Sequence, residues 1–272
     1  LLKNAGLLII DEAHHTPADT IKKIVLSSPN SVRLGLTATP FRDDNAEKLI
    51  YGLVGDIVHK IPIPLLIERG YLVPVTYYSY TTRGSVQLYE LLDNTEKYNE
   101  QFSLCVRYKR FNEQIYRAVK KLYEDGLTPI LVLVKTIKQG HILLKYLKHV
   151  DKNAIFISSK NSLKNRLEVF DAIRNGEQKI TIATSLADEG LDLPILRTVV
   201  LVTQGRSRVK LFQRIGRAMR PYPGKKDAVV VDVVFDYERF VDHFYERAKA
   251  IEEELKIEVK ELEVPESHVR KG

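Results

Sequence analysis

Short apolar runs alternate with amphipathic stretches along most of the chain. Leu7–Ile10 is a continuous apolar run, which is typical of a parallel strand covered on both faces. The pattern predicts further strands over 32–36, 130–134, 154–157, 179–183, 198–202 and 228–233. Helical spacing and end signals predict helices over 16–27, 44–55, 62–70, 137–149, 163–174, 207–219 and 237–256, and another that ends at Gly126. This alternation predicts an α/β fold whose parallel sheets carry helices on both faces.

The pattern changes in the middle of the chain and divides it into segments. Residues 73–80 are rich in β-branched and aromatic side chains, and residues 81–104 show no clear period. We therefore expect a linker or crossover over 72–106. It separates a first domain over 1–71 from a second over 107–236, and a helix with a solvated, charge-mixed tail is expected over 237–272.

Composition is that of a globular protein. Of the 272 residues, 44% are hydrophobic and 28% are charged, which excludes collagen-like, low-complexity and wholly disordered chains. The apolar runs are far shorter than the roughly 18 residues that a membrane span needs. A single cysteine and the lack of a charged, then apolar leader indicate a reducing, intracellular compartment, either cytoplasm or nucleoid or nucleus.

The chain is moderately basic, with 42 Lys and Arg against 35 Asp and Glu and a formal net charge of +7. Clustered basic residues neutralise phosphates and release counterions, so nucleic acid is the leading special partner. The ordinary alternative is a solubilising surface. The only methionine is Met219, so we expect the sequence to begin partway into a longer protein.

The residues Asp11-Glu12-Ala13-His14 directly follow the first apolar run. Two adjacent carboxylates at a strand end can divide the work of nucleotide hydrolysis. One can hold Mg²⁺ through water, because this ion keeps much of its hydration shell, and the other can polarise an attacking water. The alternative is a solvated turn, although this tetrapeptide rarely arises by chance in a chain of this length.

Two further motifs follow predicted strands, and a third lies on the predicted helix over 207–219. Thr37-Ala38-Thr39-Pro40 ends the second strand, where a threonine-rich turn is the ordinary alternative. Residues 184–194 offer hydroxyls and a glycine turn for phosphate, with Asp192 as an acceptor for a ribose hydroxyl. In 213–220, Arg217 and Arg220 lie three residues apart on one helical face, either as phosphate clamps or as part of a basic surface helix.

In this order and spacing, the four motifs resemble motifs II, III, V and VI of superfamily 2 helicases and translocases, from Leu7 to about Val234. Residues 39–42 and 189–194 are similar to the duplex-DNA branch, namely XPB-like helicases, phage branch-migration helicases and restriction-enzyme translocase subunits. DEAH-type RNA helicases usually carry Ser-Ala-Thr at the third motif. The resemblance implies a partial first and a complete second RecA-like domain, with duplex or branched DNA favoured over RNA and no membrane partner.

The same resemblance implies the catalytic roles. Asp11 would hold the Mg²⁺ of ATP through water, and Glu12 would activate the hydrolytic water. His14 and Gln213 would link the acid motif to the second domain.

The remaining roles come from the other motifs. Arg217 and Arg220 would act as arginine fingers on the γ-phosphate, where charge builds up in the transition state. Further candidates are Thr37 and Thr39 for coupling hydrolysis to movement, Gly190 and Asp192 for binding ATP, and Thr136, Arg166 and Thr184 for holding the DNA backbone.

One departure from the family pattern is large. No Gly-x-x-x-x-Gly-Lys-Ser/Thr phosphate loop occurs, and Gly224-Lys225-Lys226 lacks the hydroxyl and follows the sixth motif. We therefore expect a fragment of an ATP-dependent DNA helicase or translocase that is inactive alone. The alternatives are a non-catalytic nucleic-acid-binding module and a motor subunit of a restriction or repair complex with protein partners.

Overall fold

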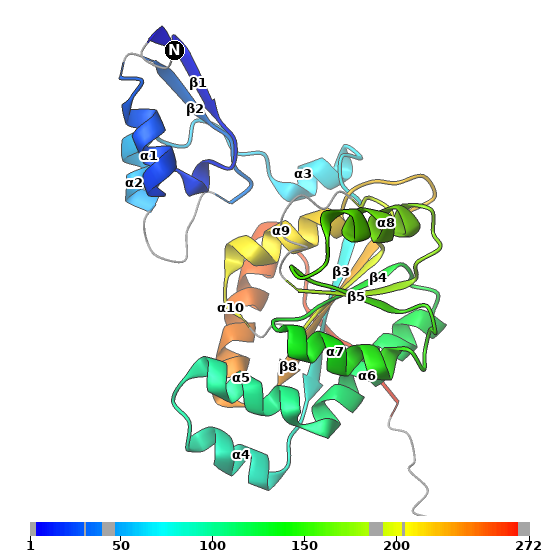
Figure 1. The fold of residues 1–272 in the computed structure, drawn as a ribbon. Coiled ribbons are helices and arrows are strands. Elements are labelled where there is room, and N and C mark those ends of the chain that lie inside the picture. Colours follow the sequence, from blue (N-terminus) through cyan, green and yellow to red (C-terminus); the bar gives the residue numbers. More distant parts are fainter. Residues whose placement is uncertain (1–3, 30, 40–46, 185–192, 203–204, 266–272) are drawn as a thin grey trace, which may run out of the picture. The chain divides into compact units, whose positions relative to one another are not determined.

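The chain forms two units, each with its own parallel sheet (Figure 1). The structure is a computed structural model, and it describes residues 4–29, 31–39, 47–184, 193–202 and 205–265. The first unit comprises the described residues up to 62 together with 207–213. The second comprises 63–206 and the residues from 214 onward. Among the described helices, none has the length and apolar character needed to cross a membrane.

The first unit is small. Its elements are β1 (Leu7–Ile10), the short 3-10 helix η2 (Ala13–His15), α1 (Asp19–Leu26), β2 (Val32–Gly35) and α2 (Glu47–Leu53). The two strands pair in parallel, with Leu7 opposite Val32 and Ile10 opposite Gly35. Ile10, Ala13, Val25 and Leu53 form its buried core.

The expectation that Leu7–Ile10 is covered on both faces is wrong. The strand is present and parallel, but the side chains of Leu7 and Ile9 are 54% and 58% exposed, whereas Ile10 is buried. Among the described residues, β1 pairs only with β2, and the core of this unit lies on one face of the two strands.

The second unit is built on a seven-stranded parallel sheet of order β5-β6-β4-β7-β8-β3-β9. Its strands are β3 (Val75–Thr82), β4 (Ile130–Leu133), β5 (Ile155–Ile157), β6 (Ile180–Ala183), β7 (Thr198–Leu201), β8 (Ala228–Phe235) and β9 (Lys260–Glu261). Its helices are α3 (Ile63–Glu68), α4 (Val86–Asp93), α5 (Tyr98–Arg107), α6 (Lys109–Glu124), α7 (Ile137–Leu147), α8 (Leu163–Arg174), α9 (Arg208–Ala218) and α10 (Glu238–Leu255). The first six residues of α9, 208–213, are counted with the first unit.

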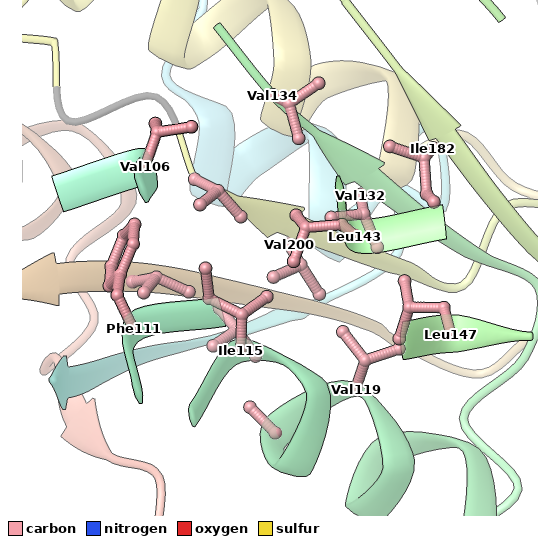
Figure 2. Packing of buried hydrophobic residues seen from close by; sticks show 14 of the residues in the cluster. Val106, Phe111, Ile115, Val119, Val132, Val134, Leu143, Leu147, Ile182 and Val200 are labelled. Carbon is pink, nitrogen blue, oxygen red and sulfur yellow. The ribbon is translucent and has the colours of Figure 1, made fainter. Parts of the chain in front are cut away.

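Helices cover both faces of this sheet, as the alternating pattern predicts. Figure 1 shows α6 and α7 on one side and α8 on the other. Phe111, Ile115 and Val119 on α6 pack with Val132 and with strand and α7 side chains in the main core (Figure 2). Alternate residues of β4, β6, β7 and β8 belong to this core, so the remaining ones face the opposite side of the sheet.

Residues 72–106 do not form the expected linker. They contain β3, which pairs with β8 along its full length, followed by α4 and α5, whose apolar side chains enter the main core. The tail also differs from expectation, because α10 buries Phe240, Ile251 and Leu255, and β9 then pairs with β3. Both segments belong to the second unit because their apolar residues pack against strands distant in sequence.

Candidate functional site

The acid pair lies in a tight turn after β1. The N–H of Ala13 donates to the carbonyl of Leu36 at 2.9 Å, which holds this turn beside the end of β2. Glu12 has a φ of 50°, a left-handed conformation that is unusual for a residue with a side chain. Its N–H donates to the Asp11 carboxylate at 2.8 Å, and both side chains are exposed. The turn therefore presents two carboxylates at the carboxyl end of a strand.

A buried histidine connects this turn with the threonine motif. His14 Nδ1 lies 2.9 Å from Thr37 Oγ1 and 3.3 Å from Glu12 Oε2. The Thr37 hydroxyl donates to the carbonyl of Thr39 at 3.2 Å and accepts the N–H of Thr39 at 3.1 Å. The structure thus brings together Asp11, Glu12, His14, Thr37 and Thr39.

The acid turn suits a magnesium–nucleotide complex. Its donors are carboxylate oxygens, which Mg²⁺ prefers, and this ion completes its shell with water and phosphate oxygens. The described residues contain no group of three or more His, Cys, Asp or Glu that could hold a metal. An ion at this turn would therefore need further ligands, such as water and phosphate oxygens, beside its carboxylates.

In the second unit, the three predicted nucleic-acid contacts follow neighbouring strands. Thr136 follows β4, Thr184 follows β6, and Arg166 lies in the first turn of α8, the helix after β5. Because β5, β6 and β4 are adjacent and parallel, all three positions lie at the carboxyl edge of the sheet. Thr136 also caps α7, since its hydroxyl accepts the N–H of Gln139 at 3.2 Å. That cap alone is a sufficient structural reason for threonine there.

The predicted ATP-contacting residues have different outcomes. Gly190 and Asp192 lie outside the described residues. Gln213 and Arg217 lie on α9 and are partly exposed. The expectation that Arg220 belongs to the same helix is wrong, because α9 ends at Ala218 and Arg220 lies exposed in the following turn. A weak bond from the Arg220 N–H to the Arg217 carbonyl, at 3.4 Å, keeps that turn close to helical.

A lysine next to this turn was missed as a site residue. Lys225 Nζ lies within hydrogen-bond distance of four backbone carbonyls, those of Pro194, Leu196 and Arg220 at 2.9, 2.7 and 3.0 Å and that of Ala218, so at least two of them share one of its three N–H groups. Burial lowers the pKa of Lys225 to about 8, and the nearby Asp227 acts in the opposite direction. All four acceptors are backbone groups, so no side-chain motif in the sequence could have identified this contact.

A buried ion pair was also missed. Arg247 on α10 donates through Nε and Nη2 to the two carboxylate oxygens of Asp232 on β8 at 2.7 and 2.9 Å. The hydroxyl of Tyr77 on β3 donates to the same carboxylate at 2.7 Å. Burial and the Asp232 charge raise the pKa of Tyr77 well above its ordinary value. The trio ties α10 to the neighbouring strands β8 and β3 and is structural in character.

Family models match two parts of the chain. The model described as "Helicase conserved C-terminal domain" matches residues 114–222. The model described as "Type III restriction enzyme, res subunit" matches residues 1–42. These two ranges hold all four motifs singled out in the sequence.

Curated relatives and solved structures agree with these matches. A protein of Sulfolobus islandicus filamentous virus, named as a helicase, is 40% identical over 93% of this chain and 47% of its own length. The DNA 3'-5' helicase XPB of Kineococcus radiotolerans is 30% identical over 79% of this chain and 37% of its own. The chain thus spans about half or less of these relatives. The L327V variant of the S. cerevisiae protein Dbp5, solved with RNA and ADP BeF3, has the same fold. Its TM-score is 0.64 at 15% identity, over 96% of this chain and 60% of its own.

Proposed function

Because the chain belongs to the superfamily 2 helicases, we propose that it is part of an ATP-dependent motor that moves along or remodels DNA. The observation that carries this proposal is the contact between the acid turn and the threonine motif through His14. A hydrolytic carboxylate is thereby connected to a second strand end, as a motor needs if hydrolysis is to drive movement.

In this proposal the residues of the four motifs divide the work of ATP hydrolysis. Asp11 holds the Mg²⁺ of ATP, and Glu12 accepts a proton from the attacking water. The left-handed backbone at Glu12 supports this role, because such conformations gather at functional sites. Arg217 and Arg220 neutralise charge on the γ-phosphate, and Gly190 and Asp192 bind the nucleotide.

Thr136, Arg166 and Thr184 form the proposed backbone-contacting edge in the second unit. The name of the Kineococcus relative and the residues at 39–42 and 189–194 favour DNA over RNA. Comparing ATPase stimulation by duplex DNA, single-stranded DNA and duplex RNA tests this preference. Equal stimulation by RNA would overturn the DNA proposal and leave the motor proposal intact.

The central experiment is Glu12→Gln in the full-length protein. The amide cannot accept the proton, so we expect the hydrolysis rate to fall by about 10² or more while nucleotide affinity is retained. Asp19→Asn is the matched control, since Asp19 is an exposed carboxylate in the first turn of α1 in the same unit. A Glu12→Gln protein with the wild-type rate would show that Glu12 is not the general base and would contradict the proposed role of the acid pair. No ATP hydrolysis by the wild-type full-length protein would instead favour a non-catalytic binding module.

The 272 residues alone are expected to hydrolyse ATP negligibly, because they contain no phosphate loop to cradle the β- and γ-phosphates.

The match of residues 1–42 to a restriction-enzyme subunit supports one further candidate, a motor subunit of such a complex. Co-purification of a nuclease or methyltransferase subunit with the full-length protein tests that candidate.

A further inference from the structure

The turn that carries the two predicted arginine fingers is held in place by hydrogen bonds from other residues to its backbone carbonyls. We call residues 217–220 the arginine turn. Lys225 Nζ binds the carbonyls of Ala218 and Arg220, and the N–H of Val73 donates to the carbonyl of Met219 at 2.8 Å. Three consecutive carbonyls therefore have donors from outside the turn, and two of them share one ammonium group.

The same ammonium group reaches a second segment. Its bonds to the carbonyls of Pro194 and Leu196 fix the backbone just after residues 184–192, which include the proposed nucleotide contacts. Lys225 thus connects two segments: the residues that directly follow the fifth motif and the residues at the end of the sixth motif. An ammonium group suits this place, because carbonyls at the end of a helix carry partial negative charge.

We propose that Lys225 is a positioning residue for ATP hydrolysis, setting the place of the arginine turn relative to the segment that follows the fifth motif. This rests on the proposed function, since it assumes that Arg217 and Arg220 act on the γ-phosphate. Lys225 has no contact with the nucleotide in this proposal. Its effect passes through the backbone that carries the two guanidinium groups.

Lysine is suited to this task in a way that other residues are not. With a pKa of about 8, the group is protonated at neutral pH and has three N–H donors on one atom. A single atom can therefore bond to carbonyls from two segments, whereas the planar donors of arginine diverge. Neighbouring Lys226 is exposed and serves as a natural comparison.

The test is Lys225→Met in the full-length protein, which keeps the apolar stem and removes every donor. We expect kcat of DNA-stimulated ATPase to fall by about 10- to 100-fold, because small misplacements of catalytic groups have effects of this size. KM for ATP and the Kd for DNA should change by less than about two-fold, since ground-state binding is retained. Lys226→Met should match the wild type. Equal kcat in Lys225→Met and Lys226→Met would overturn the proposal.

A double-mutant cycle separates this proposal from the proposed function. Arg217→Ala should itself lower kcat, and adding Lys225→Met should lower it little further if the lysine acts through the arginine turn. Fully additive losses would overturn the positioning role. A wild-type rate in Arg217→Ala would instead refute the arginine-finger role on which this inference depends.

Lys225→Arg is a second test, which applies if the Lys225→Met variant does not fold. It keeps the cation but cannot place one donor atom among all four carbonyls, so kcat should again fall while KM stays near wild type. Thermal melting and far-UV circular dichroism establish that the variant is folded. A folded Lys225→Arg protein with wild-type kcat would overturn the proposal.

Discussion

Strands β1 and β4 have nearly the same composition, Leu-Leu-Ile-Ile and Ile-Leu-Val-Leu, but very different surroundings. β4 pairs with β6 and β7 and is covered on both faces, so all four of its residues are buried. β1 pairs with β2 alone among the described residues, and Leu7 and Ile9 remain exposed. The difference teaches that an apolar run predicts a strand, whereas its burial depends on what the rest of the chain places around it.

Carboxylates in the two units show the same contrast. The Asp232 side chain is 1% exposed and is paired with Arg247, whereas the Glu12 side chain is 51% exposed beside His14. A buried charge needs its partner, because desolvation is costly. An exposed carboxylate with a buried neighbour is instead available to a ligand. The charge of Asp232 should therefore matter for stability, and the charge of Glu12 should matter for chemistry.

Replacing each carboxylate by its amide gives the largest expected difference. Asp232→Asn leaves Arg247 buried without its charge partner, so we expect a loss of about 3–5 kcal/mol in the free energy of unfolding. Glu12→Gln should change it by about 0.5 kcal/mol or less, since the side chain is half exposed. Urea denaturation followed by circular dichroism measures both. Similar losses in the two variants would contradict the contrast.

Truncating one leucine in each unit tests the hydrophobic part of the comparison. Leu143 on α7 is fully buried in the main core, and we expect Leu143→Ala to cost about 2–5 kcal/mol through lost burial and a residual cavity. Leu7→Ala should cost less than about 1 kcal/mol, because more than half of this side chain is already in contact with solvent. If Leu7→Ala were equally costly, β1 would have to be covered in solution.

Two helical glycines sharpen the comparison further. A Cβ at Gly140 on α7 would lie 2.2 Å from a ring carbon of Phe156, so Gly140→Ala should destabilise the protein by about 1–3 kcal/mol. A Cβ at Gly52 on α2 meets nothing within 4 Å, and Gly52→Ala should stabilise it by up to about 1 kcal/mol. Thermal melting of both variants measures the two shifts. Shifts of the same sign would show that α7 does not pack as tightly as described.

The single thiol reports on the second unit alone. Burial raises the pKa of Cys105 from 9.0 to about 12, so the folded state keeps the proton while the unfolded state loses it above pH 9. The stability that this thiol contributes is complete below pH 9 and is lost as the pH rises toward 12. By linkage the loss should be about 1.3 kcal/mol between pH 8 and pH 10. Urea titrations of wild type and Cys105→Ala at pH 8 and 10 measure it, and equal pH dependence would contradict the assignment.

Much of the fold follows from local pattern. The predicted strands and helices occur in the expected order because apolar spacing and glycine caps act within a few residues, as at Gly126 with its φ of 71°, whereas β3, α4, α5 and β9 were not predicted. The sheet position of β3 could not be predicted in this way. Its β-branched and aromatic residues find their place only beside β8, which lies far along the chain.

The residues of the candidate site also differ in whether local sequence could place them. Asp11, Glu12, Thr37 and Thr39 could be placed from sequence, because side chains at the ends of adjacent parallel strands must lie near each other. Their contact through His14 agrees with that expectation. Lys225 could not be placed, since its acceptors are peptide carbonyls and every residue has one.

The pairing of β3 with β8 also has a consequence during synthesis of the chain. Tyr77 and its hydrogen-bond partner Asp232 are 155 residues apart. At about 5–20 residues per second, the ribosome would add the second residue roughly 8–30 s after the first. For that interval β3 has neither of its neighbours, and its aromatic edge is open to other chains. Chaperone dependence and aggregation of nascent chains should therefore be concentrated at residues 75–82.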